Sequence, residues 1–404
     1  MRTFILLLVC ALAMTDAAAA SDQTLFDMDS VQHVPSEFTR EKAKHSTGTA
    51  ELVEGKFGKA VRFSFVEGAS GGFMVGRVRP TPGWDKADGF SFWVKGDGSH
   101  PWGGIELIDA NDYALRYAYC FPTDSTDWRK VVVRWSDLTP ELAGPLADPA
   151  DGFAPSHLGT FSFGKWFYWR DYPAQAYSID QVQLERTIPS AEPMKFEPGL
   201  ARVRAKLAAH QPITIVTMGD SLTDEHHWSN RTIVWHRLLA DKLKAKYGSE
   251  VKIVNPAIGG TTLSQNMVLM PRWSKDAPAP DLVTVWFGGN DWGTGVRGRR
   301  FAEYLRVAVD RIRQQTGGRA DVLLMTTCPS HDSWNTMAEL AQAVRDVAKE
   351  KQTGLGDVSA EFHKLANPDE GLKGEYWAWD KVHLGKEGHA RTCAVVMDAI
   401  EAAR

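Results

Sequence analysis

Cysteine is scarce in this chain, with 4 in 404 residues. One of them, Cys10, lies in an N-terminal apolar segment, which leaves Cys120, Cys328 and Cys393 for the rest of the protein. Three cysteines allow at most one bridge, so a disulfide framework is excluded and stability must come from buried apolar cores. The sequence leaves open whether one bridge forms among these three.

The chain also lacks a strong charge of either sign and a second long apolar run. Its formal net charge is −4 and its pI is about 6.3, which gives no electrostatic reason to bind nucleic acid. The apolar segment from Phe4 to Met14 is too short to span a bilayer, and no other run approaches that length. We therefore expect no membrane insertion.

The N-terminus has the pattern of an export signal. Arg2 precedes the apolar segment, and a run of four alanines ends at Ala20, directly before Ser21. A short positive region, an apolar core and small residues at a cleavage site are typical of a secretory signal peptide. We expect residues 1–20 to be such a peptide and the protein to be secreted or periplasmic.

Short β-rich segments dominate residues 21–187. Apolar side chains alternate with polar ones along several of them, as at Phe90, Phe92 and Val94, and clusters of Gly, Pro, Asp and Ser separate them. Many short strands without a convincing amphipathic helix predict a β-sandwich, specifically a jelly roll. The expected strands are 60–65, 90–94, 105–108, 115–119, 131–135, 161–163 and 179–184.

We interpret residues 188–210 as a proline-rich linker and a lead-in helix. After them, the spacing of the apolar residues changes. Apolar stripes with helical spacing start at Trp235, Phe301 and Leu340, and Gly248 stands where the first of these helices would end. Strand-like runs fall between them, at 213–218, 251–254, 282–287, 322–325 and near Leu355. Alternating strands and helices predict a three-layer α/β/α domain with a parallel sheet over residues 211–404.

Four short motifs in this second half place reactive side chains next to the expected strands. In chain order they are Gly219-Asp-Ser-Leu222, Asn255-Pro-Ala-Ile-Gly-Gly260, Gly288-Gly-Asn-Asp291 and Asp380-Lys-Val-His383. A serine is a poor nucleophile at neutral pH unless a base takes its proton. His383 is the best-placed base for Ser221, and Asp380 is spaced to orient the ring and stabilise the imidazolium.

Together these motifs resemble those of the SGNH (GDSL-type) serine hydrolases, over residues 211–404. The resemblance implies that Ser221, Asp380 and His383 are catalytic. It also implies that the Ser221 amide, the Gly260 amide and the Asn290 side chain form the oxyanion hole for the tetrahedral intermediate. No cofactor is expected. No metal is expected either, because the candidate ligands at 224–227 are adjacent in sequence and would diverge.

The β-rich half resembles, by its pattern alone, the galactose-binding-like carbohydrate-binding modules of secreted polysaccharide enzymes. This second resemblance leaves open whether the domain binds calcium or sugar. Flat aromatic faces suit sugar rings, so we expect Trp292 and Trp377, together with His227, to contact the substrate.

The two resemblances imply a secreted esterase that removes O-acetyl or other short acyl groups from a polysaccharide or oligosaccharide. One alternative is a lipid or lysophospholipid esterase with the same catalytic fold. The other is a non-catalytic carbohydrate-binding protein whose hydrolase half is vestigial.

Overall fold

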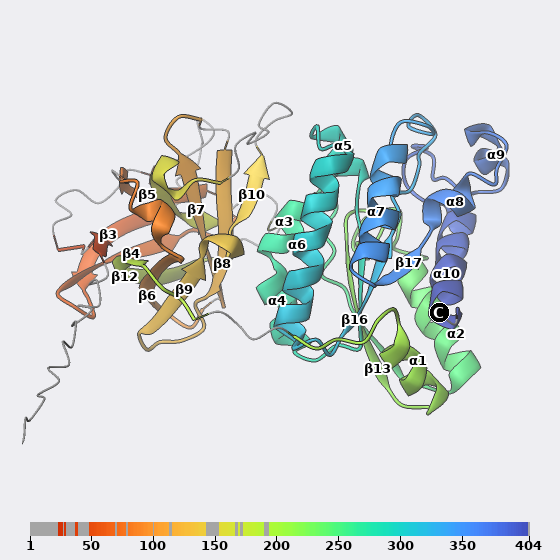
Figure 1. Cartoon of the computed structure of the whole chain (residues 1–404), viewed down its shortest axis with the longest axis horizontal. Coiled ribbons are helices and arrows are strands. Elements are labelled where there is room, and N and C mark those ends of the chain that lie inside the picture. The colour runs from red at the N-terminus through yellow and green to blue at the C-terminus, as the bar shows by residue number, and fades with distance from the viewer. Residues whose placement is uncertain are drawn as a thin grey trace, which may run out of the picture.

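The computed structural model describes residues 23–26, 28–29, 37–38, 48–68, 71–77, 80–99, 101–112, 115–142, 153–165, 169, 173–189 and 194–402. An all-β domain and an α/β domain lie side by side (Figure 1). The expected signal peptide, residues 1–20, lies outside the described residues, so export stays a prediction.

The all-β domain consists of two six-stranded antiparallel sheets. The first has the order β3-β4-β12-β6-β9, with β1 also paired to β12, and the second has the order β10-β8-β7-β11-β5-β2. The strands of the first sheet are β1 (Gln23–Phe26), β3 (Gly48–Glu54), β4 (Lys59–Phe65), β6 (Gly89–Gly96), β9 (Arg129–Arg134) and β12 (Gln175–Glu185). Those of the second are β2 (Glu37–Phe38), β5 (Gly71–Arg77), β7 (Trp102–Asp109), β8 (Leu115–Pro122), β10 (Thr139–Leu142) and β11 (Leu158–Lys165).

Aromatic side chains fill the space between these two sheets. Phe92 of β6 is fully buried, and its ring centroid lies 5.0 Å from that of Phe121 on β8 and 5.5 Å from that of Phe163 on β11. Both pairs are edge-to-face, an arrangement that adds to the stabilisation from burial. The alternation expected at Phe90 and Phe92 therefore points into the core, and the predicted jelly-roll-like sandwich is confirmed.

The α/β domain has a parallel five-stranded sheet with the order β14-β13-β15-β16-β17. Its strands are β13 (Ile213–Gly219), β14 (Val251–Val254), β15 (Leu282–Trp286), β16 (Asp321–Met325) and β17 (Gly354–Gly356). One face packs against α1 (Ala201–Ala208), α2 (Trp235–Tyr247), α8 (Val358–Phe362) and α10 (Lys386–Glu401). The other packs against α3 (Leu263–Val268), α4 (Met270–Asp276), α6 (Gly298–Thr316) and α7 (Ala338–Glu350). The predicted α/β/α architecture is confirmed, with two further short helices, α5 (Gly289–Gly293) and α9 (Pro368–Lys373).

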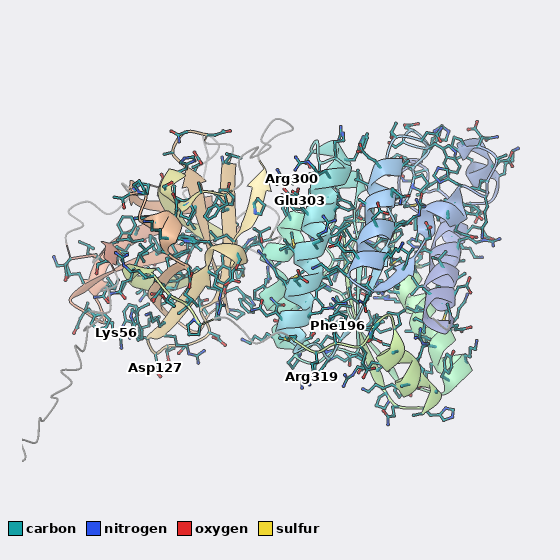
Figure 2. All side chains as sticks on the ribbon, viewed as in Figure 1. Lys56, Asp127, Phe196, Arg300, Glu303 and Arg319 are labelled. Carbon is teal, nitrogen blue, oxygen red and sulfur yellow. The ribbon has the colours of Figure 1, made fainter. Side chains whose placement is uncertain are left out.

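The chain between the domains is held against the α/β domain. The Arg313 guanidinium lies 3.4 Å from the centroid of the Phe196 ring, and Figure 2 shows Phe196 in the lower half of this domain. Gly318 has a φ of 67°, and a Cβ there would lie 2.1 Å from the Lys195 carbonyl oxygen. Only glycine lets the connecting chain pass this closely.

The three cysteines are free and buried, so none is bridged. No helix among the described residues is long and apolar enough to cross a membrane.

Two buried histidines lie where α2 contacts α10, and they predict how the unfolding free energy depends on pH. Burial lowers the pKa of His389 to about 3 and that of His236 to about 4. Below the ordinary histidine pKa of 6.5 the unfolded chain takes up these protons and the folded chain does not. Each histidine therefore costs up to about 1.4 kcal/mol of unfolding free energy per unit that the pH falls, down to its folded pKa.

His389→Leu removes one of these contributions, so the variant should lose less stability than the wild type between pH 7 and pH 5. Urea unfolding at both pH values measures the difference. Burial raises the pKa of Asp220 to about 6 and that of Asp291 to about 7, which acts in the opposite direction but equally in both proteins. Equal losses of stability in the two proteins would contradict the prediction.

Candidate active site

Ser221 stands just beyond the carboxyl end of β13, at the edge of the parallel sheet where ligands of such folds bind. Hydrogen bonds from a nearby side chain stabilise the turn that contains Ser221. The Asn230 Nδ2 donates to the Ser221 carbonyl oxygen at 2.7 Å and to the Asp224 carbonyl oxygen at 2.8 Å. A Cβ on Gly219 would lie 2.4 Å from the Thr223 Oγ1, so glycine is required where the strand enters the turn.

The structure brings Ser221, His383 and Asp380 together. The Ser221 Oγ lies 2.9 Å from the His383 Nε2, and the His383 Nδ1 lies 2.5 Å from the Asp380 Oδ2. With its proton on Nδ1, the ring donates to Asp380 and accepts from the serine hydroxyl. A base in this state can take the serine proton during attack on an acyl carbon.

Asp380 is held in its charged form. Burial alone would raise its pKa, but bonds from the His383 side chain and from the His383 and Val382 amides outweigh burial and lower the pKa. Those two amides donate to the Asp380 Oδ1 at 3.0 and 3.2 Å. The carboxylate therefore keeps its geometry and its negative charge next to the ring that becomes cationic.

The expected oxyanion donors lie around the serine. Asn290, in α5, donates from Nδ2 to the Thr261 carbonyl oxygen at 3.0 Å, which fixes the orientation of its amide, and makes a longer contact of 3.5 Å to the Asp220 Oδ2. Gly260 has a φ of 78°, in the left-handed region that favours glycine. Ser221, Gly260 and Asn290 all line the same cavity, so the structure places the three donors on one site.

Asp224 has a role that the sequence did not reveal. Its Oδ2 accepts from the Gly259 amide at 2.9 Å, and its Oδ1 accepts from the His226 amide at 2.8 Å. The carboxylate thus ties the turn after Ser221 to the loop at residues 257–260, which we call the oxyanion loop. From the sequence we considered Asp224 only as one of the adjacent candidate metal ligands at 224–227 and rejected that role. No three His, Cys, Asp or Glu side chains among the described residues gather as metal ligands.

Ser221 opens into a cavity of about 730 Å³. Aromatic, imidazole, charged and backbone groups make up most of its lining, and Ala257 and Ile258 are the two aliphatic contributors. The lining residues are Trp169, Ser221, Asp224, His226, His227, Trp228, Arg231, Ala257, Ile258, Gly259, Gly260, Asn290 and His383.

Of the three residues expected to contact the substrate, one lines the cavity and two do not. His227 lines the cavity, and its ring centroid lies 4.3 Å from that of His383. Burial and the nearby His383 lower the His227 pKa, so its ring is neutral at neutral pH. Trp377 is buried against Phe362, and Trp292 lies under the Arg297 guanidinium at 3.8 Å, and neither is among the lining residues of this cavity.

Two other tryptophans stand beside the catalytic histidine. The Trp228 ring centroid lies 5.5 Å from that of His383 and 5.3 Å from that of Trp379. Trp379 is 81% exposed and Trp228 is 41% exposed, so both side chains are accessible to solvent. From the sequence we singled out neither of them.

Residues 217–391 match the model of the GDSL-like lipase/acylhydrolase family, so this part of the chain is a GDSL-like acylhydrolase domain. No curated protein matches the chain.

Several solved structures are similar to parts of it. An acetylxylan esterase from Geobacillus stearothermophilus is 24% identical, with a TM-score of 0.38, and the match covers 48% of this chain and 96% of that one. A lipase/acylhydrolase from Enterococcus faecalis is 20% identical, with a TM-score of 0.39, covering 46% and 95%. A family 11 carbohydrate-binding module from Clostridium thermocellum is 18% identical, with a TM-score of 0.34, covering 42% and 98%.

Proposed function

We propose that this protein, with its GDSL-like acylhydrolase domain, is a secreted serine esterase that removes O-acetyl groups from a polysaccharide. The proposal rests on one observation. Hydrogen bonds connect Ser221 through His383 to Asp380, and Ser221 and His383 line a cavity that contains aromatic and polar side chains. An intact series of this kind also argues against a vestigial hydrolase.

The reaction follows from these positions. The Ser221 Oγ attacks the acetyl carbon while the His383 Nε2 takes its proton, and the oxyanion is stabilised by the Ser221 and Gly260 amides and by Asn290. His383 then gives the proton to the departing sugar oxygen, which leaves an acetyl-serine. A water molecule, deprotonated by His383, attacks this ester, and the serine recovers its proton as acetate leaves.

The cavity walls favour a short acyl group on a polar alcohol. With Ala257 and Ile258 as the two aliphatic lining residues, a long acyl chain finds little aliphatic surface. Each methylene that stays exposed forgoes about 0.8 kcal/mol of burial free energy. The exposed indole surfaces of Trp228 and Trp379 suit the apolar face of a sugar ring instead.

Activity is therefore expected to fall steeply along the series p-nitrophenyl acetate, butyrate and octanoate, measured as kcat/KM. Mass spectrometry of acetylated polysaccharides before and after treatment tests the natural substrate, with loss of acetyl groups as the expected result. A preference for octanoyl esters, or for phospholipid vesicles over acetylated polysaccharide, would favour the lipid esterase instead.

Trp228→Ala is expected to raise KM for an acetylated oligosaccharide by up to about 10-fold, because an aromatic stacking contact is worth about 0.5–1.5 kcal/mol and about 1.4 kcal/mol corresponds to a factor of ten. KM for p-nitrophenyl acetate should change little, since that ester has no sugar ring. Trp292→Ala, which removes a tryptophan outside the cavity lining, is the matched comparison. If the oligosaccharide KM rises with Trp292→Ala and not with Trp228→Ala, the original assignment of Trp292 holds and the Trp228 assignment fails.

A further inference from the structure

The β domain meets the hydrolase domain through the outer face of its second sheet. Six buried side chains from both domains form one apolar group, which we call the interdomain cluster: Trp102, Ala118, Cys120, Trp169, Val268 and Leu269. The first four belong to the β domain, on β7, on β8 and beyond β11, whereas the last two lie at the end of α3. Figure 1 shows α3 on the side of the hydrolase domain that faces β8 and β10.

This cluster reaches the catalytic site. Ile258 packs against it, and Ile258 is followed directly by Gly259 and Gly260 of the oxyanion loop. Trp169 is 1% exposed and is at the same time a lining residue of the cavity that holds Ser221. One tryptophan of the β domain therefore lines the active-site cavity and belongs to the same apolar cluster on which the oxyanion loop packs.

Polar contacts fix the two domains relative to each other around this cluster. Arg311 of α6 donates to the Ser136 and Leu138 carbonyl oxygens, each at 2.9 Å, and to the Thr139 hydroxyl. Burial lowers the Arg311 pKa to about 10, so the guanidinium remains charged at neutral pH. On α4, the Lys275 Nζ lies 2.9 Å from the Asp124 Oδ2, and the Arg272 guanidinium lies 5.6 Å from the Trp169 ring centroid.

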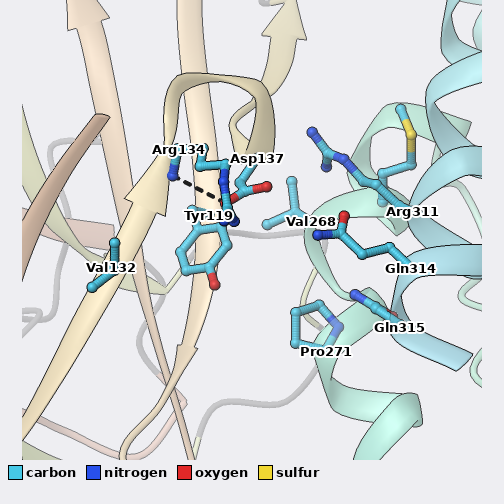
Figure 3. Close-up of a pocket in the computed structure, with 10 residues that line it drawn as sticks. Tyr119, Val132, Arg134, Asp137, Val268, Pro271, Arg311, Gln314 and Gln315 are labelled. Carbon is cyan, nitrogen blue, oxygen red and sulfur yellow. Dashed lines mark hydrogen bonds and ion pairs between the residues drawn. The ribbon is translucent and has the colours of Figure 1, made fainter. Parts of the chain in front are cut away.

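The rest of the interface is less tightly filled. Figure 3 shows Tyr119, Arg134 and Asp137 of the β domain opposite Gln314 and Gln315, around a second cavity of about 270 Å³. Val268 lines this cavity and also belongs to the interdomain cluster. Apolar side chains of the two domains thus pack together at the cluster, next to the oxyanion loop.

We propose that the β domain is a positioning part of the active site, in which Trp169 holds the oxyanion loop in place through Ile258. The proposal uses ester hydrolysis from the proposed function as a readout, but does not depend on the natural substrate. The Gly260 amide acts on charge that develops in the transition state, so a small displacement lowers kcat more than it raises KM. Displacements of about 1 Å at a catalytic group cost up to 10²-fold in rate.

The test compares full-length variants in hydrolysis of p-nitrophenyl acetate. Trp169→Ala should lower kcat by about 10-fold or more with KM within about twofold, and Trp169→Phe should restore most of the rate. The matched control is Trp93→Ala, which removes a β6 tryptophan that packs on Lys56 and Phe57. Figure 2 shows Lys56 on the side of the β domain away from the hydrolase domain, so this variant should keep its kcat.

A second pair of variants tests the route of the effect. Ile258→Ala should lower kcat in the same way, and combining it with Trp169→Ala should cost less than the two single losses together, because both disrupt the packing of the oxyanion loop on the interdomain cluster. If Trp169→Ala does not fold, the kcat of Ile258→Ala alone is compared with that of Trp93→Ala, and an unchanged kcat in folded Ile258→Ala then overturns the proposal. Thermal unfolding of each variant separates lost stability from lost rate.

The rate at which a fluorophosphonate labels Ser221 gives a readout independent of any substrate, since this reaction also places an oxygen in the oxyanion hole. Slower labelling in Trp169→Ala than in Trp93→Ala supports the proposal even if no polysaccharide ester is cleaved. The proposal is overturned if folded Trp169→Ala keeps kcat and labelling within about twofold of the wild type, or if only its KM rises.

Discussion

Ser221→Ala is expected to lower kcat for p-nitrophenyl acetate by about 10³-fold or more, with the protein still folded. The hydroxyl lies 2.9 Å from the His383 Nε2, and without it no acyl-enzyme forms. Steady-state release of p-nitrophenol measures the loss. Mass spectrometry of the wild type quenched during turnover should show an added acetyl group, which the variant should lack.

His383→Ala should cost about as much as Ser221→Ala, and the double variant little more than either, because triad members act as a unit. Asp380→Asn should cost less than either, because the variant keeps both the nucleophile and the base and loses the carboxylate that sets the tautomer of the ring and stabilises the imidazolium. A folded Ser221→Ala with near-normal turnover would show that another group is the nucleophile.

Asn290→Ala is expected to lower kcat by about 10²-fold to 10³-fold with little change in KM. The Asn290 amide is held by the Thr261 carbonyl oxygen at 3.0 Å, so its orientation is set before substrate binds. A donor fixed in advance needs no reorganisation as the oxyanion forms. Measuring kcat and KM separately, rather than their ratio alone, makes this test decisive.

Asn367→Ala provides the matched comparison for Asn290→Ala. Asn367 caps α9 by accepting from the Glu370 amide and is not a lining residue of the catalytic cavity, so its loss should cost stability, about 1 kcal/mol, and leave kcat unchanged. If Asn290→Ala raised only KM, Asn290 would be a substrate-binding residue and the oxyanion hole would need another donor.

Regular periodicity made the architecture predictable from the sequence. The stripe that starts at Trp235 becomes α2, which ends at Gly248 with a φ of 66°, as a left-handed C-cap requires. The alternation of apolar and polar residues predicted β6 equally well. The strand expected at 131–135 is β9, which ends one residue earlier because Trp135 begins a 3-10 turn. These features are local, so a single segment contains the information that specifies them.

The grouping of Ser221, His383 and Asp380 was predictable for a different reason, since each lies in a short motif that can be recognised within one segment. Contacts between distant segments left no such trace. Trp169 reaches the cavity from the other domain, and Asp224 bonds to Gly259, 35 residues further along the chain. Trp377 was expected near the substrate because it stands next to the catalytic motif, but its indole Nε1 donates to the Pro368 carbonyl oxygen inside the fold.

Ser221 and His383 are 162 residues apart in the sequence and lie near opposite ends of the segment that forms the hydrolase domain, although their side chains are in contact. Ser221 follows the first strand of the parallel sheet, whereas His383 comes just before α10, which packs on the last strand, β17. A chain that has formed only part of this sheet therefore has no paired base for its serine. Regain of esterase activity during refolding reports completion of the whole domain, and it should lag behind the recovery of secondary structure.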